Sequence, residues 1–255
     1  MFKKIRKLYK QGYKCVIGLD EAGRGPLAGP VVAAAVFAAA KLKGKSEKGK
    51  IAIKNAKLFV DIKDSKKLSA KQREEWYGIL AASPDIEWGI GIVLEKIIDK
   101  INILEATKLA MAKAVRDLEK KIGEPAEFLI IDGNFVLSQS EVCPRTSPRT
   151  DLGLLEQKAI IKADEKIFVC IAAGIIAKVT RDRMMRRLHK KYPQYGFDKH
   201  KGYGTKGHLR ALRKYGPCEA HRMTFNPIAT FLAAKKLRKK LPPGDKIQTK
   251  YGLPR

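Results

Sequence analysis

Residues 17–36 read IGLDEAGRGPLAGPVVAAAV, and the succession of apolar, acidic and glycine-rich parts in this stretch decides how the whole chain is interpreted. The apolar beginning predicts a short buried strand that stops at Asp20 and Glu21. Residues 23–30 are rich in Gly and Pro, which predicts a tight loop, and the apolar run 31–37 predicts a second strand paired with the first as a hairpin. The stretch therefore predicts two paired strands with a pair of carboxylates at the turn.

Helix and strand patterns alternate along the rest of the chain. Short apolar strands are expected at 86–94, 127–131 and 157–161, and helices at 69–80, 102–121, 166–191, 205–215 and 227–241. This alternation predicts the α/β fold class, with a mixed central sheet flanked by helices and a basic C-terminal helical subdomain. The expected parts are a basic N-terminal arm at 1–14, a main domain at 15–222 that includes a basic helical segment at 178–222, a C-terminal helix at 223–241 and a flexible basic tail at 242–255.

The charge of the chain is far from balanced. It has 53 Lys and Arg against 26 Asp and Glu, a formal net charge of +27 in 255 residues. Such an excess indicates a polyanionic partner, because Lys and Arg near phosphates release condensed counterions. Residues 178–222 alone hold 14 Lys and Arg against 3 Asp and Glu. Nucleic acid is the expected partner, and a protein that is merely basic is the alternative.

Neither the apolar runs nor the cysteines indicate a membrane or a secreted protein. The apolar stretch 31–40 is too short to span a bilayer, and acidic residues separate it from the basic N-terminus, which favours a buried strand over a signal peptide. The cysteines are widely spaced and form no Cys-x-x-Cys motif, so reduced thiols in a cytoplasmic protein are expected. They are Cys15, Cys143, Cys170 and Cys218.

Carboxylates follow three of the expected strands. Asp20 and Glu21 follow the first expected strand. Asp132 directly follows the expected strand at 127–131, and Asp164 comes shortly after the expected strand at 157–161. Carboxylates at strand ends can converge at one edge of a sheet, where they repel one another unless a cation neutralises them. Oxygen ligands without Cys or His select Mg²⁺ or Mn²⁺, and two such ions about 3.5–4 Å apart suit the attack of water on a phosphodiester. A single Asp after a strand is more often a turn or cap residue, so the hypothesis depends on these side chains meeting.

Asp20 and Glu21 are adjacent, and adjacent residues on an extended strand face opposite sides of a sheet. Both carboxylates can therefore reach one site only if the chain turns there, which Gly23 and Gly25 would permit. The same glycines would let backbone N–H groups approach a ligand closely. We therefore expect the chain to bend at the acidic pair.

Six blocks of the sequence resemble the ribonuclease HII family and occur in the family's order. They are IGLDEAGRGPLAGPVVAAAV (17–36), DSKKLS (64–69), LIIDGN (129–134), KAD (162–164), IAAGIIAKVTRDRMM (171–185) and HKGYGTKGHL (200–209). The resemblance implies an endoribonuclease whose main domain is ribonuclease H-like and whose segment 178–222 binds substrate. It implies cleavage on the 5′ side of ribonucleotides in RNA–DNA hybrid duplexes and in DNA containing ribonucleotides, leaving 3′-hydroxyl and 5′-phosphate ends. It also implies that Asp20, Glu21, Asp132 and Asp164 are catalytic and hold two ions, Mg²⁺ or Mn²⁺.

Further matches imply residues that read the sugar. Gly23, Arg24 and Gly25 match the loop that reads the ribose 2′-hydroxyl, the group that distinguishes ribose from deoxyribose at one nucleotide. Tyr203 matches the tyrosine that packs against the sugar on the DNA side of an RNA–DNA junction, where the alternative is an ordinary loop aromatic. The resemblance thus implies that one loop and one tyrosine together set the specificity.

Four basic residues fit as phosphate contacts, with a solvated surface position as the equal alternative for each: Lys66, Lys67, Lys178 and Arg181. Asp182 resembles a catalytic acid, but its arginine neighbours on a helix indicate a local ion pair instead. All four histidines fall within 178–222 and are expected in phosphate contacts or in packing.

Two rival interpretations stay open. The sister family ribonuclease HIII has a Gly-Lys-Gly loop, so Arg24 favours HII, as does the small number of residues before the first block. A catalytically silent nucleic-acid-binding protein fits the charge equally well, but it gives no reason for carboxylates on a phosphate-binding surface. A monomer without membrane association is expected. Residues 248–253 resemble a sliding-clamp peptide only faintly, because its apolar anchors are missing, so a clamp partner has little support.

Overall fold

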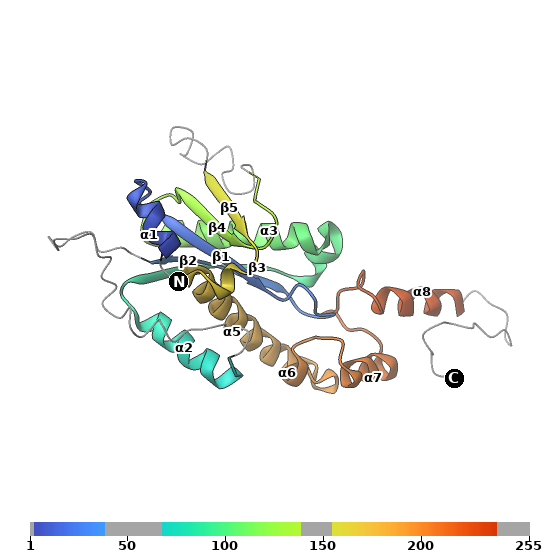
Figure 1. The fold of residues 1–255 in the computed structure, drawn as a ribbon. Coiled ribbons are helices and arrows are strands. Elements are labelled where there is room, and N and C mark those ends of the chain that lie inside the picture. The colour runs from blue at the N-terminus through green and yellow to red at the C-terminus, as the bar shows by residue number, and fades with distance from the viewer. Residues whose placement is uncertain (1–2, 39–67, 139–154, 239–255) are drawn as a thin grey trace.

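The computed structural model describes residues 3–38, 68–138 and 155–238, and these residues form a five-stranded sheet flanked by helices (Figure 1). The strands are β1 (Val16–Ala22), β2 (Val31–Ala38), β3 (Ile86–Val93), β4 (Phe128–Asp132) and β5 (Glu156–Ile160), in the order β3-β2-β1-β4-β5. The strands β1, β2 and β3 pair antiparallel, whereas β4 runs parallel to both β1 and β5. The predicted mixed sheet and the predicted hairpin are confirmed.

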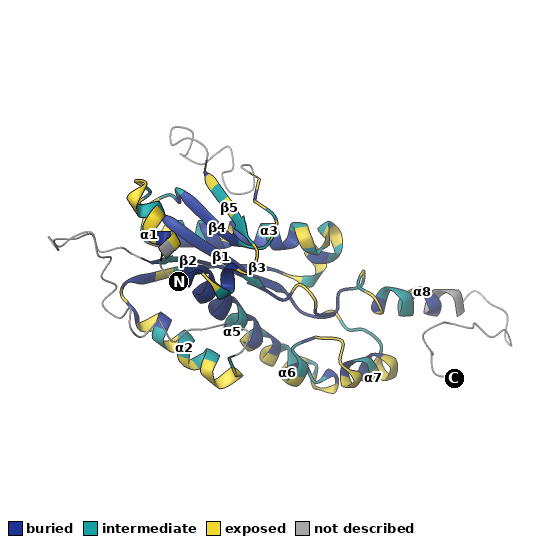
Figure 2. Cartoon of the chain, viewed as in Figure 1, coloured by how far each residue is buried: buried dark blue, intermediate teal, exposed yellow. Residues whose placement is uncertain are grey.

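Helices cover both faces of the sheet. They are α1 (Lys3–Lys10), α2 (Ala70–Ala82), α3 (Glu95–Ile122), α5 (Phe168–Lys191), α6 (Phe197–His200), α7 (Lys206–Tyr215) and α8 (Ile228–Arg238), with 3-10 turns η3 (Ala163–Glu165) and η4 (Pro193–Tyr195). Helix α3 packs on β2 and β3 on one face, and α5 packs on β1 and β2 on the other, with α2 against α5 (Figure 1). The central strands and the start of α5 are therefore the most buried part of the molecule (Figure 2).

The alternation of side chains along β1 explains the two layers of core. Val16 belongs to the cluster packed against α5, whereas Ile17 and Leu19 belong to the cluster packed against α3. Gly18 faces α5, and a Cβ at that position would collide with Val169 at the start of the helix. The strand thus lets α5 approach closely at the level where the acidic residues follow.

Helix α3 begins earlier than the sequence indicated. The expected start at Asn102 is a break inside the helix, because Asn102 has φ 66° and ψ 169°. Its side-chain Oδ1 accepts the N–H groups of Leu104 (2.9 Å) and Glu105 (3.1 Å), as a cap at the N-terminus of a helix does. The predicted start at Asn102 therefore coincides with this capping residue, but a preceding helical stretch from Glu95 was missed. Leu104, close to this break, is an exposed apolar side chain.

The basic segment at 1–14 contains helix α1, which the sequence analysis did not predict. Ile5 is buried in the cluster against α5, and the Tyr9 hydroxyl donates to the Ala38 carbonyl at 3.0 Å. Lysines on the opposite side of this short helix obscured its apolar stripe. The segment therefore contributes to the core as well as to the charge.

The expectations about the cysteines and about the membrane can be compared with the structure for the described residues. Cys15, Cys170 and Cys218 form no disulfide among the described residues, and Cys143 lies outside them. Within the described ranges, every helix is too short or too polar to cross a membrane.

The close packing of β3 on α3 gives a test of the fold. A Cβ at Gly91 would collide with the main-chain carbonyl oxygen of Ala110, which a side-chain rotation cannot relieve. We expect Gly91→Ala to lower the free energy of unfolding by at least about 2 kcal/mol and the melting temperature by about 5 °C, measured by thermal denaturation. The matched control is Gly78→Ala on exposed α2, where nothing lies within 4 Å and the change should stabilise the helix by up to about 1 kcal/mol. Equal melting temperatures for the two variants would contradict this packing.

Candidate active site

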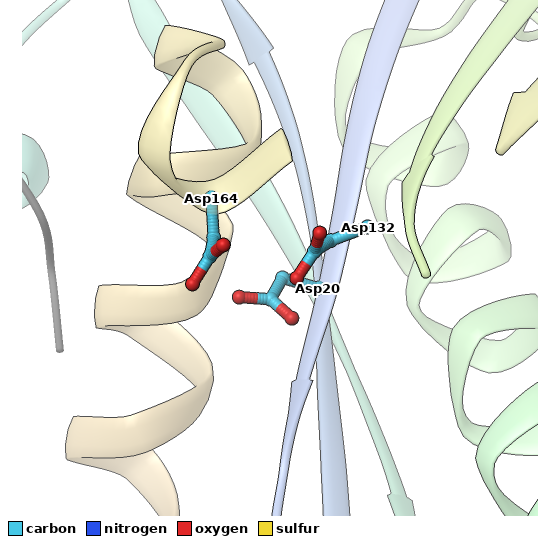
Figure 3. Close-up of side chains that lie close together, drawn as sticks. All are labelled: Asp20, Asp132 and Asp164. Atoms are coloured by element: carbon cyan, nitrogen blue, oxygen red, sulfur yellow. The ribbon is translucent and has the colours of Figure 1, made fainter. Parts of the chain in front are cut away.

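The parallel register of β1 and β4 places two of the acidic residues side by side. Leu19 pairs with Ile131, so Asp20 and Asp132 are the next residues in register and face the same side of the sheet. Asp164 reaches them from η3, the turn between β5 and α5. Each of these aspartates offers one carboxylate oxygen, and the three oxygens lie within 4.8 Å of one another (Figure 3). The sequence therefore brings together three carboxylates from three separate segments.

Burial makes this cluster electrostatically unfavourable without a cation. Asp20 and Asp164 are buried. Burial, followed by the charges of Glu21 and Asp132, raises the pKa of Asp20 well above its usual value. Two hydrogen bonds hold the carboxylates in place: the Glu21 N–H donates to Asp20 Oδ1, and the Ala163 N–H donates to Asp132 Oδ1, both at 2.7 Å. The geometry thus fixes like charges close together, as a metal centre requires.

Glu21 lies beside this cluster rather than within it. The expected bend at Asp20 and Glu21 is wrong, because β1 stays extended through Ala22. Both residues nevertheless line the same pocket. Glu21 Oε1 instead accepts a hydrogen bond from Arg24 at 3.2 Å, and its Oε2 is buried without a hydrogen-bond partner among the described residues. Burial raises the pKa of Glu21, and Arg24 partly opposes that rise. The backbone turns only afterwards, at Gly23, with φ of 103°.

The acidic residues open onto a pocket that continues into a basic groove. The pocket is lined by Asp20, Glu21, Ala22, Gly23, Arg24, Gly25, Arg73, Asp164, Gly174, Lys178 and Tyr203. The adjoining groove shares Arg73, Lys178 and Tyr203 with it and adds four further cations, Lys71, Arg186, Lys199 and Lys201, together with Glu74 and Asp182. An anionic ligand that enters the groove would therefore lead directly to the carboxylates.

The residues expected to read the sugar gather at this pocket. Gly23, Arg24 and Gly25 line one wall, and Tyr203 lines the pocket as an exposed side chain with 47% of its surface accessible. Gly25 lies beside the Tyr203 ring: a Cβ at Gly25 would be 3.7 Å from Cε1 of that ring, an ordinary van der Waals contact. The loop and the tyrosine are therefore neighbours across the entrance.

The expected phosphate contacts have different surroundings. Lys178 lines both pocket and groove, and its Nζ donates to Asp182 at 2.7 Å, so Asp182 is in a local ion pair, with this lysine rather than with an arginine. Burial lowers the pKa of Lys178 despite that pair. Lys66 and Lys67 lie outside the described residues.

Arg181 is not placed to contact phosphate. Its side chain is buried, and its guanidinium donates to the carbonyls of Pro30 (2.9 Å), Lys201 (3.0 Å) and Ala28 (3.1 Å). These hydrogen bonds direct the cation into the protein, so the phosphate contact suggested for Arg181 is corrected to a structural role. Burial also lowers the pKa of Arg181 to about 10, which leaves it charged at neutral pH.

Sequence reasoning missed Arg73 and Arg222. Arg73 lies in the first turn of α2, lines both pocket and groove, and donates to the Leu68 carbonyl. Its signal was its place just after the block at 64–69, within a helix that had been predicted. Arg222 is buried and donates to main-chain carbonyls of the glycine-rich loop. Nothing in the local sequence distinguishes it from the surrounding basic residues.

Three of the four histidines are packed near Tyr203. His208 Nδ1 lies 2.9 Å from the Tyr203 carbonyl, which can only accept, so this nitrogen carries the proton. His208 Nε2 then accepts from His221 Nε2 at 3.0 Å, and His221 Nδ1 accepts the Cys218 N–H at 2.9 Å. The ring of His200 stacks on His208. Of the two expectations for these histidines, packing is the one that fits, and the chain of hydrogen bonds ends on the residue at the pocket entrance.

Comparison with known proteins now identifies the family. A family model described as Ribonuclease HII matches residues 17–228. The chain belongs to the ribonuclease HII family. Ribonuclease HII from Chlamydia muridarum (strain MoPn / Nigg) is 46% identical over 219 residues, which cover 86% of this chain and 85% of that protein. The family is one of hydrolytic nucleases, so the prediction of an enzyme is confirmed.

Solved structures agree with the fold prediction. The ribonuclease H2 from Pyrococcus horikoshii OT3 is 28% identical, with a TM-score of 0.63 over 88% of this chain and 99% of that chain. RNase HII of Archaeoglobus fulgidus, solved as a complex with PCNA, is 25% identical, with a TM-score of 0.58 over 82% of this chain and 92% of that chain. Membership of the ribonuclease HII family implies ribonuclease H activity on RNA–DNA hybrids and dependence on a divalent metal.

The repulsion within the carboxylate cluster predicts an unusual stability change. Asp132→Asn removes one charge from the surroundings of Asp20 and keeps an oxygen to accept the Ala163 N–H. In chelator we expect this variant to melt about 2–4 °C above the wild type, corresponding to about 1 kcal/mol. Added Mn²⁺ should then raise the melting temperature of the wild type more than that of the variant.

The control for this measurement is Glu105→Gln, because Glu105 lies on α3, away from the pocket, and forms an ion pair with Lys108 one turn further along the helix. That variant should have the melting temperature of the wild type in chelator, and Mn²⁺ should raise the melting temperature of both proteins equally. A lower melting temperature for Asp132→Asn in chelator would argue against carboxylate repulsion at the site.

Proposed function

We propose that this ribonuclease HII hydrolyses the phosphodiester on the 5′ side of ribonucleotides, in RNA–DNA hybrids and at ribonucleotides embedded in duplex DNA, leaving 3′-hydroxyl and 5′-phosphate ends. The observation that carries the proposal is the meeting of Asp20, Asp132 and Asp164 within 4.8 Å at the end of a groove lined by cations. Carboxylates beside bound phosphates weaken binding unless cations bridge them. A catalytically silent binding protein would therefore be harmed by the very residues that a metal-dependent nuclease needs.

Asp20, Glu21, Asp132 and Asp164 are the proposed ligands of two divalent ions, Mg²⁺ or Mn²⁺. Their chemistry fits, because every donor is a carboxylate oxygen, burial raises the pKa of Asp20, and the buried Oε2 of Glu21 accepts no hydrogen bond within the described residues. Positive charge at this place would stabilise the ionised carboxylates. When bound, such ions supply that charge, lower the pKa of a coordinated water and stabilise the leaving oxygen.

The residues of the chain would position the nucleotide on which the water acts. The glycine loop, defined as residues 23–30, presents Gly23, Arg24 and Gly25 to the pocket, and these are the proposed readers of the 2′-hydroxyl. Tyr203 stands across the entrance and would pack against the sugar of the deoxyribonucleotide that follows the ribonucleotide. Because the two are neighbours, one junction between ribose and deoxyribose would contact both.

The groove would hold the flanking duplex. Lys178 and Arg73 lie where groove and pocket join, and Lys71, Lys199 and Lys201 lie further along the groove. These cations are suited to phosphate oxygens and would hold the duplex without reading its sequence. Lys66 and Lys67 remain proposed phosphate contacts, whereas Arg181 is left out because its donors point inward.

The setting of the reaction is part of the proposal. We place the enzyme in the cytoplasm as a monomer that removes ribonucleotides from DNA. The Archaeoglobus fulgidus relative was solved with PCNA, and a sliding clamp is the protein partner to test first for this chain. The faint clamp-like match at 248–253 lies outside the described residues.

A cleavage assay tests the proposed function directly. A DNA duplex with one embedded ribonucleotide should be cut on the 5′ side of that ribonucleotide in Mg²⁺ or Mn²⁺ and remain intact in chelator, as resolved on a sequencing gel. Asp132→Asn should lower kcat about a hundredfold or more, because one source of stabilisation at the reacting phosphate is lost, while the Kd for the duplex changes little. Glu105→Gln serves as the control and should cut normally. Wild-type turnover by Asp132→Asn would refute the assignment of the site.

Tyr203 gives a test of the junction. Loss of stacking on a sugar or base costs about 1–3 kcal/mol, so Tyr203→Ala should lower kcat/KM for the single-ribonucleotide duplex about tenfold. A long RNA–DNA hybrid, which offers no deoxyribose after the cut, should be affected much less. Tyr215→Ala is the control, since Tyr215 is a similarly exposed tyrosine at the end of α7. Equal losses on both substrates would exclude a role at the junction.

A further inference from the structure

Two buried arginines hold the glycine loop from behind. Arg222 donates from Nε to the Gly29 carbonyl (3.0 Å), from Nη1 to the Arg24 carbonyl (2.8 Å), and from Nη2 to the carbonyls of Gly23 (2.6 Å) and Gly29 (2.8 Å). Its side chain is fully buried, and its guanidinium also lies over the ring of Phe225. One arginine from the far end of the domain therefore binds three carbonyls of the loop.

Arg181 of α5 completes the arrangement from the other end of the loop. It donates to the carbonyls of Ala28 and Pro30 and, beyond the loop, to Lys201. A Cβ at Gly23 would collide with its guanidinium, so the absence of a side chain there lets the loop close over the arginine. The two guanidiniums together bind five of the eight carbonyls of the glycine loop.

Burying two guanidinium groups is energetically unfavourable, which indicates that their hydrogen bonds have a function. Neither arginine forms a salt bridge within the described residues, and the hydrogen bonds of each guanidinium go to main-chain carbonyls. Burial, together with the charge of Arg181, lowers the pKa of Arg222 to about 9, and it stays protonated at neutral pH. The charges of Glu95 and Asp99 act on Arg222 as well and oppose this lowering of its pKa. A buried cation that serves packing alone could be replaced by an apolar side chain at less cost. The five donors of a planar guanidinium are needed where several carbonyls must be held in fixed directions.

Peptide geometry links these carbonyls to the pocket. In a trans peptide the carbonyl of one residue and the N–H of the next point in opposite directions. When the carbonyls of Gly23 and Arg24 point inward to Arg222, the N–H groups of Arg24 and Gly25 point away from it. Gly23, Arg24 and Gly25 line the pocket, so these two N–H groups are directed to the side on which the nucleotide would lie.

We propose that Arg222, supported by Arg181, is a positioning residue that sets the ribose specificity of the enzyme by fixing the orientation of the glycine-loop peptides. This inference rests on the proposed function, since it concerns the loop that reads the 2′-hydroxyl. Arg222 lines neither the pocket of the carboxylates nor the adjoining groove. It acts through the peptides of Gly23, Arg24 and Gly25, which a more mobile loop could not hold toward a single hydroxyl group.

The experiment compares recognition of ribose with recognition of the rest of the duplex. KM is measured in Mg²⁺ for a DNA duplex with one embedded ribonucleotide, and the matching all-DNA duplex is used as a competitive inhibitor to give its Ki. The ratio of Ki to KM reports the contribution of the single 2′-hydroxyl. Arg222→Lys keeps the charge but cannot form the guanidinium fork. We expect it to lower the ratio about tenfold by raising KM, with Ki unchanged, as for loss of one or two well-placed hydrogen bonds.

The readout separates positioning from simple destabilisation. A variant that merely folds less completely would lose apparent kcat in proportion to its inactive fraction, and its ratio of Ki to KM would not move. Arg181→Lys is the second variant and should lower the ratio less, because its carbonyls lie further from Gly23 and Arg24. Arg213→Lys on exposed α7 is the matched control and should leave the ratio at the wild-type value. All variants are assayed below their own melting temperatures.

Each outcome decides something different. If the wild type fails to cut the ribonucleotide duplex, the proposed function itself is wrong. If the wild type cuts it and both Arg222→Lys and Arg181→Lys keep the wild-type ratio, the nuclease stands and the positioning role is overturned. Failure of both variants to fold would also overturn it, because the arginines would then support the whole fold rather than the loop.

Discussion

The parallel pairing of β1 with β4 is the constraint on which the active site depends. Because Leu19 pairs with Ile131, Asp20 and Asp132 follow side by side on the face covered by α5. A slip of one residue would turn Asp132 to the other face and would move each of its apolar neighbours from one core cluster into the other, where it does not fit the packing. The attraction of apolar side chains for both helix layers therefore decides the register, and the carboxylates, which repel one another, are held together by it. Core packing supplies the free energy that the site lacks.

In a chain of net charge +27, the carboxylates of the site lie at one end of a basic groove. Attraction and repulsion of the substrate explain this arrangement. Surface cations attract a polyanion from a distance, whereas the buried carboxylates would repel its phosphates at contact. Divalent ions reconcile the two, since they bind carboxylates and phosphate oxygens together. Lys178 illustrates the boundary: it lines pocket and groove, is partly desolvated, and remains paired with Asp182. Affinity and chemistry are thus separated in space but joined at a few side chains.

The parts that the sequence predicted are those governed by local pattern. Apolar runs and helical spacing were sufficient for the sheet and most helices, and acids after strands were sufficient for the aspartate cluster. What failed depends on distant partners: Arg181 looks like a surface cation until its carbonyl acceptor at Pro30 is known, a residue 151 positions away in sequence. The bend expected at Glu21 was wrong because the strand continues past it, as its pairing with Ala33 shows. Lys66 and Lys67 of the second block lie outside the described residues.

Recognition of a single hydroxyl group requires a rigid surface. The glycine loop and Tyr203, which form the entrance of the pocket, do not belong to a β-strand. Buried polar bonds hold them instead. Leu27 donates its N–H to the Gly202 carbonyl at 2.8 Å, and the histidine chain that begins at Cys218 ends on the Tyr203 carbonyl. The bond from Leu27 to Gly202 and the bond between His208 and His221 join segments that the sheet does not connect. Because unpaired groups in such surroundings are costly, the network has few alternative arrangements of similar energy. Loop and tyrosine therefore keep a fixed spacing, and a fixed spacing is what allows one oxygen atom on the sugar to determine where the enzyme acts.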